Sequence, residues 1–302
     1  MSDIAALVRA LRAEQLPALQ GEPLSRHTTF QIGGPAAVFC RPETPAQLLR
    51  TLELCREHGV RSYLLGNGSN TLFSDAGFDG AVVCTVEMKR PVTVSGNVLR
   101  AAAGAPLGAV CRKAQQAGLA GLAFAFGIPG TVGGAVYMNA GAYGGEMKDV
   151  LLSVRYLTAE GQIEEAPAAA LDLGYRHSIF ESNGGCILSA AVGLAPGDPG
   201  AIAARMNDLM GRRRDKQPLD KPSAGSTFKR PVGAFAGALI EQCGLRGHRH
   251  GGAAISEKHC GFVVNLGGAT CADVLALCSE VQQIVKEQTG FVLEKEIRVV
   301  EL

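Results

Sequence analysis

Two glycine-rich segments mark places where the backbone itself could bind a ligand. The first, GNGSN at 66–70, follows the apolar run RSYLL at 61–65, which predicts a short strand. A strand that ends in glycines lets several N–H groups point into one small space, and such a concavity suits phosphate oxygens. The segment lacks the Lys-Ser/Thr pair of a P-loop and the third glycine of the dinucleotide fingerprint. Taken alone, the segment is more simply explained as an ordinary turn.

The second segment, GIPGTVGGAVYMNAGAYGG at 127–145, contains seven glycines and no charged residue. Thr131 is placed to cap a helical turn, whose start would direct N–H groups and a partial positive charge at a phosphate. Gly133 and Gly134 would let the backbone approach that phosphate closely.

A packing seam of small residues is the alternative explanation of the second segment. It accounts for the glycines but not for the polar cluster of Asn139, Tyr143 and Glu146 around a further turn. The two segments together favour a dinucleotide-like ligand.

Composition excludes several classes of protein. The chain has 302 residues, of which 47% are hydrophobic, as is usual for a globular protein. Its formal net charge is only +1, so no overall electrostatic field attracts nucleic acid or acidic membranes. Nine cysteines without a CxxC pair indicate reduced, mostly buried thiols. His248 and His250 are a weak metal motif, because no Cys or carboxylate follows at ligand spacing, and we expect no metal.

No membrane insertion is expected either. Residues 114–145 carry no charge, but glycines and Pro129 interrupt them before a span of ~20 apolar residues is reached. The N-terminus predicts an amphipathic helix rather than a signal peptide. We therefore expect a cytoplasmic protein.

Helix and strand patterns alternate without a strict βαβ order, which predicts an α+β fold. Thr44 and Thr270 are predicted helix caps, and Gly59, Gly118 and Gly290 are predicted helix ends. Composition breaks divide the chain into three predicted regions, 1–86, 87–200 and 201–302.

Ser226 stands in SAGSTFKRP (223–231), three residues before Lys229. If this segment is helical after Gly225, Lys229 faces the same way as Ser226 and favours loss of its proton. The alternative is that Ser226 or Thr227 only caps that helix.

The whole chain resembles the UDP-N-acetylenolpyruvoylglucosamine reductase family. HTTFQIGGPA (27–36), LGNGSNTLFSD (65–75) and GIPGTVGGAVYMNAGAYGGE carry the resemblance, and YRHSIF, SAGSTFKRP, GGAAISEKHCGFVVN and LEKEIRVV extend it. It implies a vanillyl-alcohol-oxidase (PCMH)-type fold with two FAD-binding subdomains, 1–86 and 87–200, and a substrate-binding domain, 201–302. The short connection between Arg176 and Ser226 resembles the compact branch, which lacks a tyrosine-bearing loop.

The resemblance also implies which residues hold non-covalent FAD. Its diphosphate would lie among backbone N–H groups of the two glycine segments, and its isoalloxazine near Asn139–Tyr143. The FAD-binding residues implied are Gly66, Asn67, Gly68, Ser69, Asn70, Gly127, Pro129, Gly130, Thr131, Gly133, Gly134, Ala135, Asn139, Gly141 and Tyr143.

The implied reaction is the NADPH-dependent reduction of UDP-N-acetylglucosamine enolpyruvate to UDP-N-acetylmuramate, a peptidoglycan precursor. NADPH reduces the flavin, which then passes hydride to the enolpyruvyl methylene carbon. Such a reduction needs a cation for the developing enolate and one proton donor. The resemblance assigns the proton to Ser226, the carboxylate contact to Arg176 and an acid or orienting role to Glu296, with Glu294 as the neighbouring alternative.

Substrate contacts are expected from Lys229 and from Arg214 and Lys216 of the basic run 212–216, which would approach the sugar-nucleotide diphosphate. An ordinary solvated helix end explains that run equally well. Two other functions stay open: a different flavin oxidase or dehydrogenase of the same fold, and a non-catalytic flavin- or nucleotide-sugar-binding module.

Overall fold

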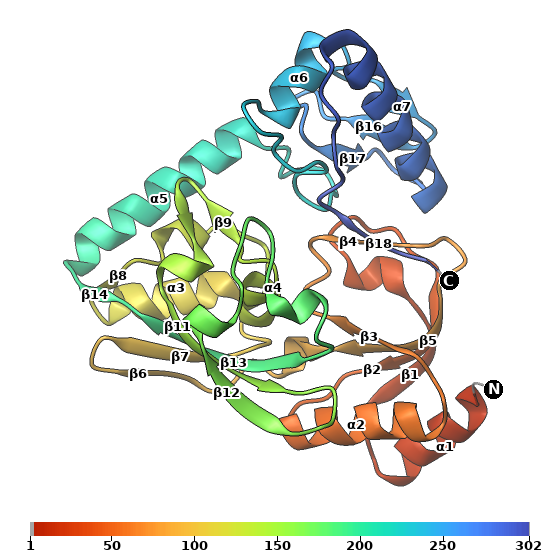
Figure 1. Cartoon of the computed structure of the whole chain (residues 1–302), viewed down its shortest axis with the longest axis vertical. Helices are drawn as coiled ribbons and strands as arrows, with labels where there is room; N and C mark the ends of the chain where they lie inside the picture. Colours follow the sequence, from red (N-terminus) through yellow and green to blue (C-terminus); the bar gives the residue numbers. More distant parts are fainter. Residues whose placement is uncertain (1–2, 302) are drawn as a thin grey trace. The chain divides into compact units, whose positions relative to one another are not determined.

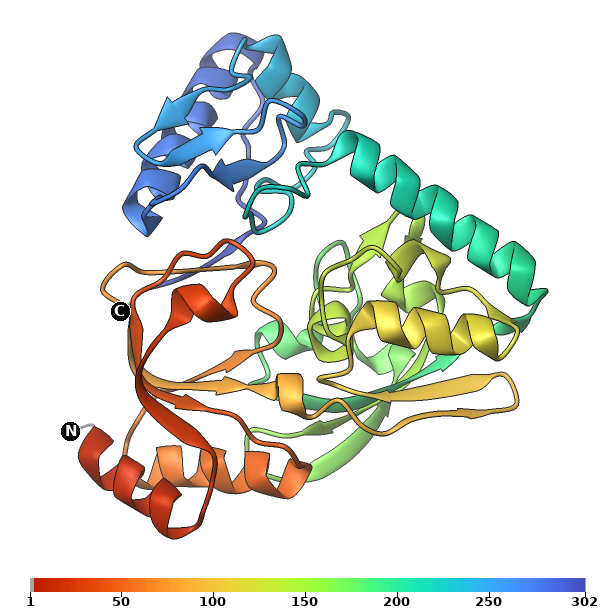
Figure 2. The same ribbon diagram turned by 180° about the vertical axis from the view of Figure 1, so that it is seen from behind.

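Two helices and a four-stranded sheet form the N-terminal part of the fold. In the computed structural model, which describes residues 3–301, α1 (Ile4–Ala13) and α2 (Pro45–Glu57) lie side by side, as Figure 2 shows. Thr44 caps α2 by accepting a hydrogen bond from the Gln47 N–H at 3.2 Å, as predicted. The sheet order is β1–β2–β5–β3, with β1 at Ala18–Pro23, β2 at Pro35–Cys40, β5 at Phe78–Cys84 and β3 at Ser62–Leu65.

A five-stranded antiparallel sheet dominates the middle of the chain (Figure 1). Its order is β12–β11–β13–β7–β6, with strands Ile163–Pro167, Leu151–Leu157, Cys186–Gly193, Val98–Ala102 and Val92–Ser95. The helices of this region are α3 (Leu107–Gln116), α4 (Val132–Tyr137) and α5 (Pro199–Lys216). Two short ladders accompany them: β8 (Leu119–Ala120) with β14 (Ala195–Pro196), and β9 (Gly141–Ala142) with β10 (Gly145–Glu146).

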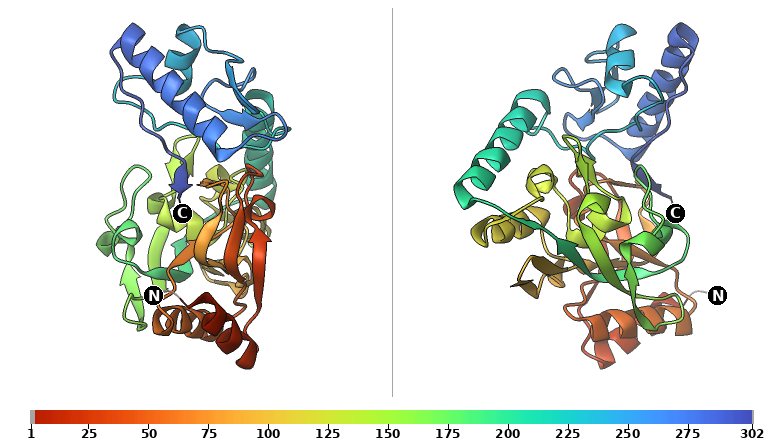
Figure 3. Two further views of the ribbon diagram at one scale, coloured as in Figure 1. Left: turned by 90° about the vertical axis from the view of Figure 1, so that its right-hand side faces the viewer. Right: turned by 60° about the vertical axis from the view of Figure 1, so that its left-hand side comes forward.

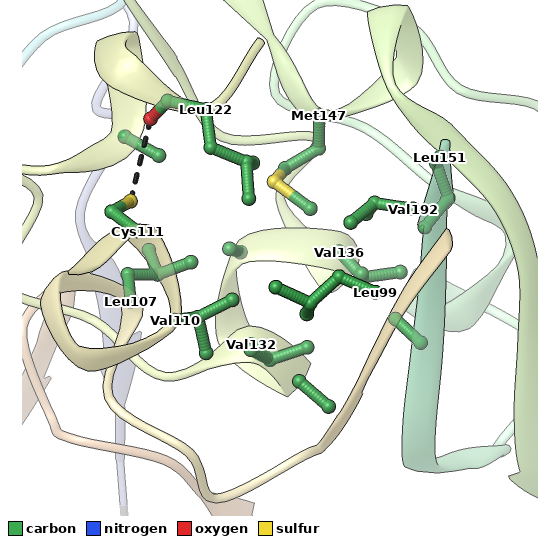
Figure 4. Packing of buried hydrophobic residues seen from close by; sticks show 14 of the residues in the cluster. Leu99, Leu107, Val110, Cys111, Leu122, Val132, Val136, Met147, Leu151 and Val192 are labelled. Atoms are coloured by element: carbon green, nitrogen blue, oxygen red, sulfur yellow. Dashed lines mark hydrogen bonds between the residues drawn. The ribbon is translucent and has the colours of Figure 1, made fainter. Parts of the chain in front are cut away.

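The helix α4 is held in place by apolar packing. Val132 and Val136 from α4 meet Leu99 of β7, Val110 of α3 and Met147 in one buried cluster (Figure 4). Each of these side chains is at most 4% exposed, so the cluster fixes the position of α4 within the second glycine segment.

The C-terminal part of the chain has a small sheet and two helices. Figure 3 shows α7 as the long helix of this part. Its elements are α6 (Ala236–Gln242), β15 (Arg249–His250), β16 (Ala253–Ile255), β17 (Val263–Asn265), α7 (Cys271–Thr289) and β18 (Arg298–Val300). Thr270 caps α7 as predicted, and the structure adds a capping box with Asp273. Gly290 ends the helix with a φ of 76°. β18 pairs in parallel with β4 (Thr71–Phe73).

The described chain forms two compact units. Unit 1 contains the residues up to 19, 38–67 and 80–213; unit 2 contains 20–37, 68–79 and the residues from 214 on. Two insertions from the N-terminal third therefore belong structurally to the C-terminal unit. The mixture of helices and antiparallel strands confirms the predicted α+β class, whereas the three predicted regions stay a prediction.

Thiols and membrane segments complete the description. All nine cysteines, which lie within residues 3–301, are free, and only Cys243 is not buried, as composition predicts. Burial raises the pKa of Cys40, Cys111 and Cys278 to about 12 in each case. Among the helices of residues 3–301, none combines the length and apolar character that crossing a bilayer requires.

Candidate functional site

The first glycine segment is a tightly packed loop after β3. Gly68 has a φ of +59°, and a Cβ there would lie 2.1 Å from the His27 carbonyl oxygen, so only glycine fits. The Asn67 amide donates to the Pro129 carbonyl at 2.8 Å and ties this loop to the second glycine segment. The two glycine segments are therefore joined by a direct hydrogen bond.

Three successive N–H groups of this loop have no acceptor in the described chain. Asn67, Gly68 and Ser69 donate from the backbone to no oxygen of residues 3–301, although Gly68 is buried. A buried N–H without an acceptor is unfavourable, so such a row is a binding site for oxygens from outside the chain. These donors fit a diphosphate.

The start of α4 is different, and here the prediction from sequence is wrong. Thr131 caps the helix as expected, because its hydroxyl accepts from the Gly134 N–H at 3.3 Å. The N–H groups of Val132 and Gly133, however, donate to the Ala105 and Ala103 carbonyls at 2.9 and 2.8 Å. The segment 103–105 that follows β7 occupies the helix start, so these N–H groups do not point at a phosphate.

The glycines of the second segment make room for different neighbouring residues. A Cβ on Gly127 would lie 2.7 Å from Arg213 Nε, and one on Gly133 would lie 3.0 Å from Ala103 Cβ. Gly134 is exposed, and the nearest atom to its Cβ position is Thr131 Oγ1 at 3.5 Å. Gly134 thus has no neighbour within the described chain that requires a glycine, which fits close approach of a ligand.

The predicted anion contact Arg176 lies in a tight turn that is anchored to α4 and the loop after it. Ser178 Oγ donates to the Tyr137 carbonyl at 2.7 Å, and Asn139 Nδ2 donates to the Gly174 carbonyl at 2.8 Å. The Arg176 guanidinium donates to the Gly141 carbonyl at 3.2 Å. Arg176 has a φ of 55°, so the turn holds a non-glycine residue in the left-handed region. The structure thus brings Arg176 next to Gly141, while its role as an anion contact stays a prediction.

Asn139 holds this arrangement from the interior. Its side chain is fully buried; Nδ2 also donates to Glu146 at 2.8 Å, and Oδ1 accepts from the Lys148 N–H at 2.9 Å. The amide is occupied by these bonds, which indicates that Asn139 shapes the loop rather than offering its side chain to a ligand.

Tyr143 is supported by an arginine that the sequence analysis did not single out. The Tyr143 ring is 39% exposed, and the Arg213 guanidinium carbon lies 5.7 Å from its centroid. Arg213 is buried on α5, and burial lowers the pKa of its guanidinium. Its spacing from the apolar residues Ile202, Met206 and Leu209 places it on the buried face of α5, and this pattern could have identified it.

The Ser226 segment forms no helix, so the predicted helical alignment of Ser226 with Lys229 is wrong. Thr227 N–H donates to the Gly261 carbonyl at 2.8 Å, and the Thr227 hydroxyl accepts from the Val263 N–H at 2.9 Å. The Lys229 N–H donates to the Glu294 carbonyl at 2.8 Å. Bonds to distant segments therefore replace the helix, and Thr227 is a structural anchor rather than a cap. Ser226 is half-buried, and its hydroxyl makes no hydrogen bond within residues 3–301.

Glu296 lies on the segment that pairs with Ser226's neighbours. Its N–H donates to the Thr227 carbonyl at 2.8 Å, and Glu296 itself is half-buried. Glu294, the alternative, has a side chain that is 72% exposed and pairs with Lys229 Nζ at 3.4 Å. Exposure and pairing therefore favour Glu296 over Glu294. Lys229 is bound to Glu294 in this arrangement.

The basic run ends α5 as an ordinary helix terminus. Arg212 pairs with Asp208 at 3.0 Å, Arg214 and Lys216 are exposed, and the Arg214 carbonyl accepts from Lys258 Nζ. These contacts leave the predicted diphosphate role of Arg214 and Lys216 a prediction. His248 and His250 both bind the Glu280 carboxylate, at 2.9 and 2.7 Å.

The fold and its loops agree with two matches to known families. A family model described as an FAD binding domain matches residues 35–166, and one for the C-terminal domain of UDP-N-acetylenolpyruvoylglucosamine reductase matches residues 217–300. The chain combines these two parts with an α+β fold and a row of N–H donors that fit a diphosphate. It is therefore a flavin-dependent oxidoreductase.

Similar proteins narrow this class. The UDP-N-acetylenolpyruvoylglucosamine reductases of Agathobacter rectalis and Lachnoclostridium phytofermentans are each 47% identical, covering 95% and 92% of this chain and 96% and 91% of their own. The crystal structure of the reductase from Thermus caldophilus is 35% identical with a TM-score of 0.79, covering 94% of this chain and 98% of its own. The chain belongs to the UDP-N-acetylenolpyruvoylglucosamine reductase family. Between Arg176 and Ser226 its described elements are a 3-10 helix at Ile179–Glu181, β13, β14 and α5, in agreement with the compact branch.

Proposed function

We propose that this protein is an NADPH-dependent flavoenzyme that reduces the enolpyruvyl group of UDP-N-acetylglucosamine enolpyruvate. The product is UDP-N-acetylmuramate, and the reaction takes place in the cytoplasm as a step of peptidoglycan synthesis. Because peptidoglycan forms the cell wall, the reaction also contributes to cell shape and cell division. The observation that carries the proposal is the serine of the SAGSTFKRP segment. Its hydroxyl is half-buried and has no partner within residues 3–301, while the residue after it is bound to the backbone of Glu296.

The described residues fit FAD. Asn67, Gly68 and Ser69 would hold the diphosphate through their N–H groups, and Gly134 would lie against the ligand without a side chain in the way. When bound, FAD would supply the redox chemistry, the transfer of hydride between NADPH and the enolpyruvyl group. Asn139 and Tyr143 would shape the loop next to it.

The chain supplies the charge stabilisation and the proton. Arg176 would bind the substrate carboxylate and stabilise the negative charge that develops on it. Ser226 Oγ would donate a proton to the carbon that bears the carboxylate. Glu296 would orient or reprotonate the serine, and Lys229, Arg214 and Lys216 would contact the sugar nucleotide.

An anaerobic experiment tests the whole reaction on the purified protein. NADPH is added and the visible flavin band is followed, and UDP-N-acetylglucosamine enolpyruvate is added afterwards. We expect bleaching followed by recovery. Bleaching without recovery would contradict the substrate, and oxygen consumption with an alcohol would instead indicate an oxidase. Absence of a flavin band after FAD is added would contradict the cofactor site.

The role of Ser226 is tested separately with Ser226→Ala. We expect flavin reduction by NADPH near the wild-type rate, but reoxidation by substrate slower by ~10²–10⁴-fold, because a positioned acid contributes roughly that factor. Ser223→Ala on the same segment is the matched control, since Ser223 is bound through its backbone: its N–H donates to the Thr29 carbonyl at 3.1 Å, and its carbonyl accepts from Thr29 Oγ1 at 2.6 Å. Wild-type reoxidation by Ser226→Ala would rule out this proton donor.

A further inference from the structure

We propose that Asn70 is a positioning residue that connects the diphosphate-binding loop to the backbone of Glu296 and, through it, to Ser226. This inference rests on the proposed roles of those two residues. Asn70 closes the loop 66–70, where it was expected only as a contact of FAD. Its contacts within unit 2 indicate a second role, in positioning the Glu296 segment.

Asn70 is bound to the Glu296 segment on both sides of one buried residue. The Asn70 side-chain amide donates to the Glu296 carbonyl at 3.1 Å, and the Arg298 N–H donates to the Asn70 carbonyl at 2.9 Å. Ile297 between them is 5% exposed. Directly after these bonds, β4 and β18 continue as a parallel pair that begins with Thr71 beside Arg298. The loop therefore fixes where Glu296 stands along its own segment.

The same segment fixes Ser226 through Thr227. The Glu296 N–H donates to the Thr227 carbonyl at 2.8 Å, and Thr227 is bound in turn to Gly261 and Val263. Ser226 is thus one peptide away from a junction of three segments. Asn70 joins this junction to the donor loop at Glu296, whereas Thr29 joins Gly68 of the loop to Ser223 farther along the segment. Phe228 and Lys295 form the adjacent β-bridge and extend the same pairing.

This connection has a consequence for catalysis. The N–H groups of Asn67, Gly68 and Ser69 lie in the residues just before Asn70, so a diphosphate that orders this loop also orders the backbone bonded to it. Proton transfer depends steeply on geometry, and a displacement of ~1 Å can cost ~10²-fold in rate. Asn70 should therefore affect the step that needs the proton more than the step that does not.

The test separates the two half-reactions in Asn70→Ala, with FAD at saturation and oxygen excluded. We expect flavin reduction by NADPH within ~3-fold of wild type and reoxidation by the enolpyruvyl substrate slower by ~10-fold or more, because only reoxidation uses the proton donor. Gln282→Ala is the matched control: its amide donates to the Leu293 carbonyl at 2.7 Å, on the same segment but away from Glu296. It should leave the ratio of the two rates unchanged.

Three results would overturn the proposal: an equal loss in both half-reactions, a change in FAD affinity alone, or no change. Asn67→Ala, which removes a similar bond to Pro129, is expected to weaken FAD binding without changing the rate ratio at saturation. If Asn70→Ala does not fold, Asn70→Ser, whose side chain is too short to reach Glu296, takes its place. Ser226→Ala in the same assay tests the proposed proton donor independently, because its reoxidation rate is measured without any change at Asn70.

Discussion

Gly133 and Gly134 are neighbours that lack a side chain for different reasons. Gly133 makes room for the protein itself, since a Cβ there would lie 3.0 Å from Ala103 Cβ and 3.3 Å from the Ala103 carbonyl oxygen. Gly134 is exposed and meets only Thr131 Oγ1 at 3.5 Å. Glycine at position 133 thus allows close packing within the protein, whereas glycine at position 134 leaves space in which a ligand could lie.

Alanine at each position should separate the two roles. Gly134→Ala is expected to leave the flavin-free protein as stable as wild type or more stable by ~0.5–1 kcal/mol, because alanine is the better helix former. Its FAD dissociation constant should rise by ~10–100-fold, because crowding of a packed contact costs about 1–3 kcal/mol.

Gly133→Ala is the matched control and should show the reverse, a lower free energy of unfolding from the Ala103 contact. Urea unfolding of the flavin-free protein and FAD titration measure the two quantities. Unchanged FAD affinity in Gly134→Ala would contradict the ligand contact.

A second residue-scale prediction concerns the turn that carries Arg176. The hydrogen bond from the His177 ring to Glu181, at 2.7 Å, and a second contact with Asp172, at 3.2 Å, raise the pKa of His177. A folded-state pKa above the unfolded value of ~6.5 gives stability that is fully present below that value. This stability is lost as the pH rises through the folded-state pKa.

Comparison with His177→Gln isolates this contribution. The difference in free energy of unfolding between wild type and variant should be largest below pH ~6.5 and shrink at higher pH. His259→Gln is an opposite-sign control, because burial lowers the pKa of His259 and its contribution is lost as the pH falls. A difference for His177→Gln that grows with pH would contradict the assignment.

At the scale of elements, local patterns predict structure where the partners are close in sequence. Thr44 and Thr270 cap the helices that their spacing indicates, and Gly290 ends α7 in the left-handed conformation. These features depend on bonds across three or four residues, so the sequence contains all the information they need.

Elements held by distant segments could not be predicted in this way. The Ser226 segment has the local pattern of a cap and helix, but its bonds go to Gly261 and to the backbone at 294–296. The start of α4 likewise has its N–H groups taken by the carbonyls of Ala103 and Ala105. The local sequence pattern contains no information about these distant hydrogen-bond partners. The resemblance to the family identifies residues but does not give their contacts. The resemblance could therefore name candidate residues, whereas the role of Asn139 in shaping its loop could not be predicted from it.

The helix α7 illustrates how a distant segment completes an element. Besides its capping box, α7 has its first N–H groups, those of Cys271 and Ala272, bound by the Asp75 carboxylate at 2.7 and 3.0 Å. A carboxylate at a helix start also interacts favourably with the helix dipole. The insertion 68–79 thus stabilises the longest helix of unit 2.

At the scale of the molecule, the chain passes repeatedly between its two units. Residues 20–37 and 68–79 supply unit 2 with Phe30, Ile32 and Leu72, which are at most 2% exposed within its core. They also supply β4, the strand that pairs with β18. The C-terminal unit is therefore built from three separate stretches of sequence.

We accordingly expect that a fragment of residues 214–302 does not fold alone, although a family model for a C-terminal domain covers 217–300. Loss of a buried phenylalanine alone costs about 3–5 kcal/mol, and a domain has a total stability of only about 5–15 kcal/mol. The fragment also loses the Asp75 cap and the β4 pairing.

Circular dichroism should show no cooperative thermal transition for the fragment, whereas the full chain, measured at the same concentration, should melt cooperatively. Phe30→Ala in the full chain tests the same dependence without truncation and should lower the melting temperature. A cooperative transition of the isolated fragment would show that 20–37 and 68–79 are dispensable for folding of this unit.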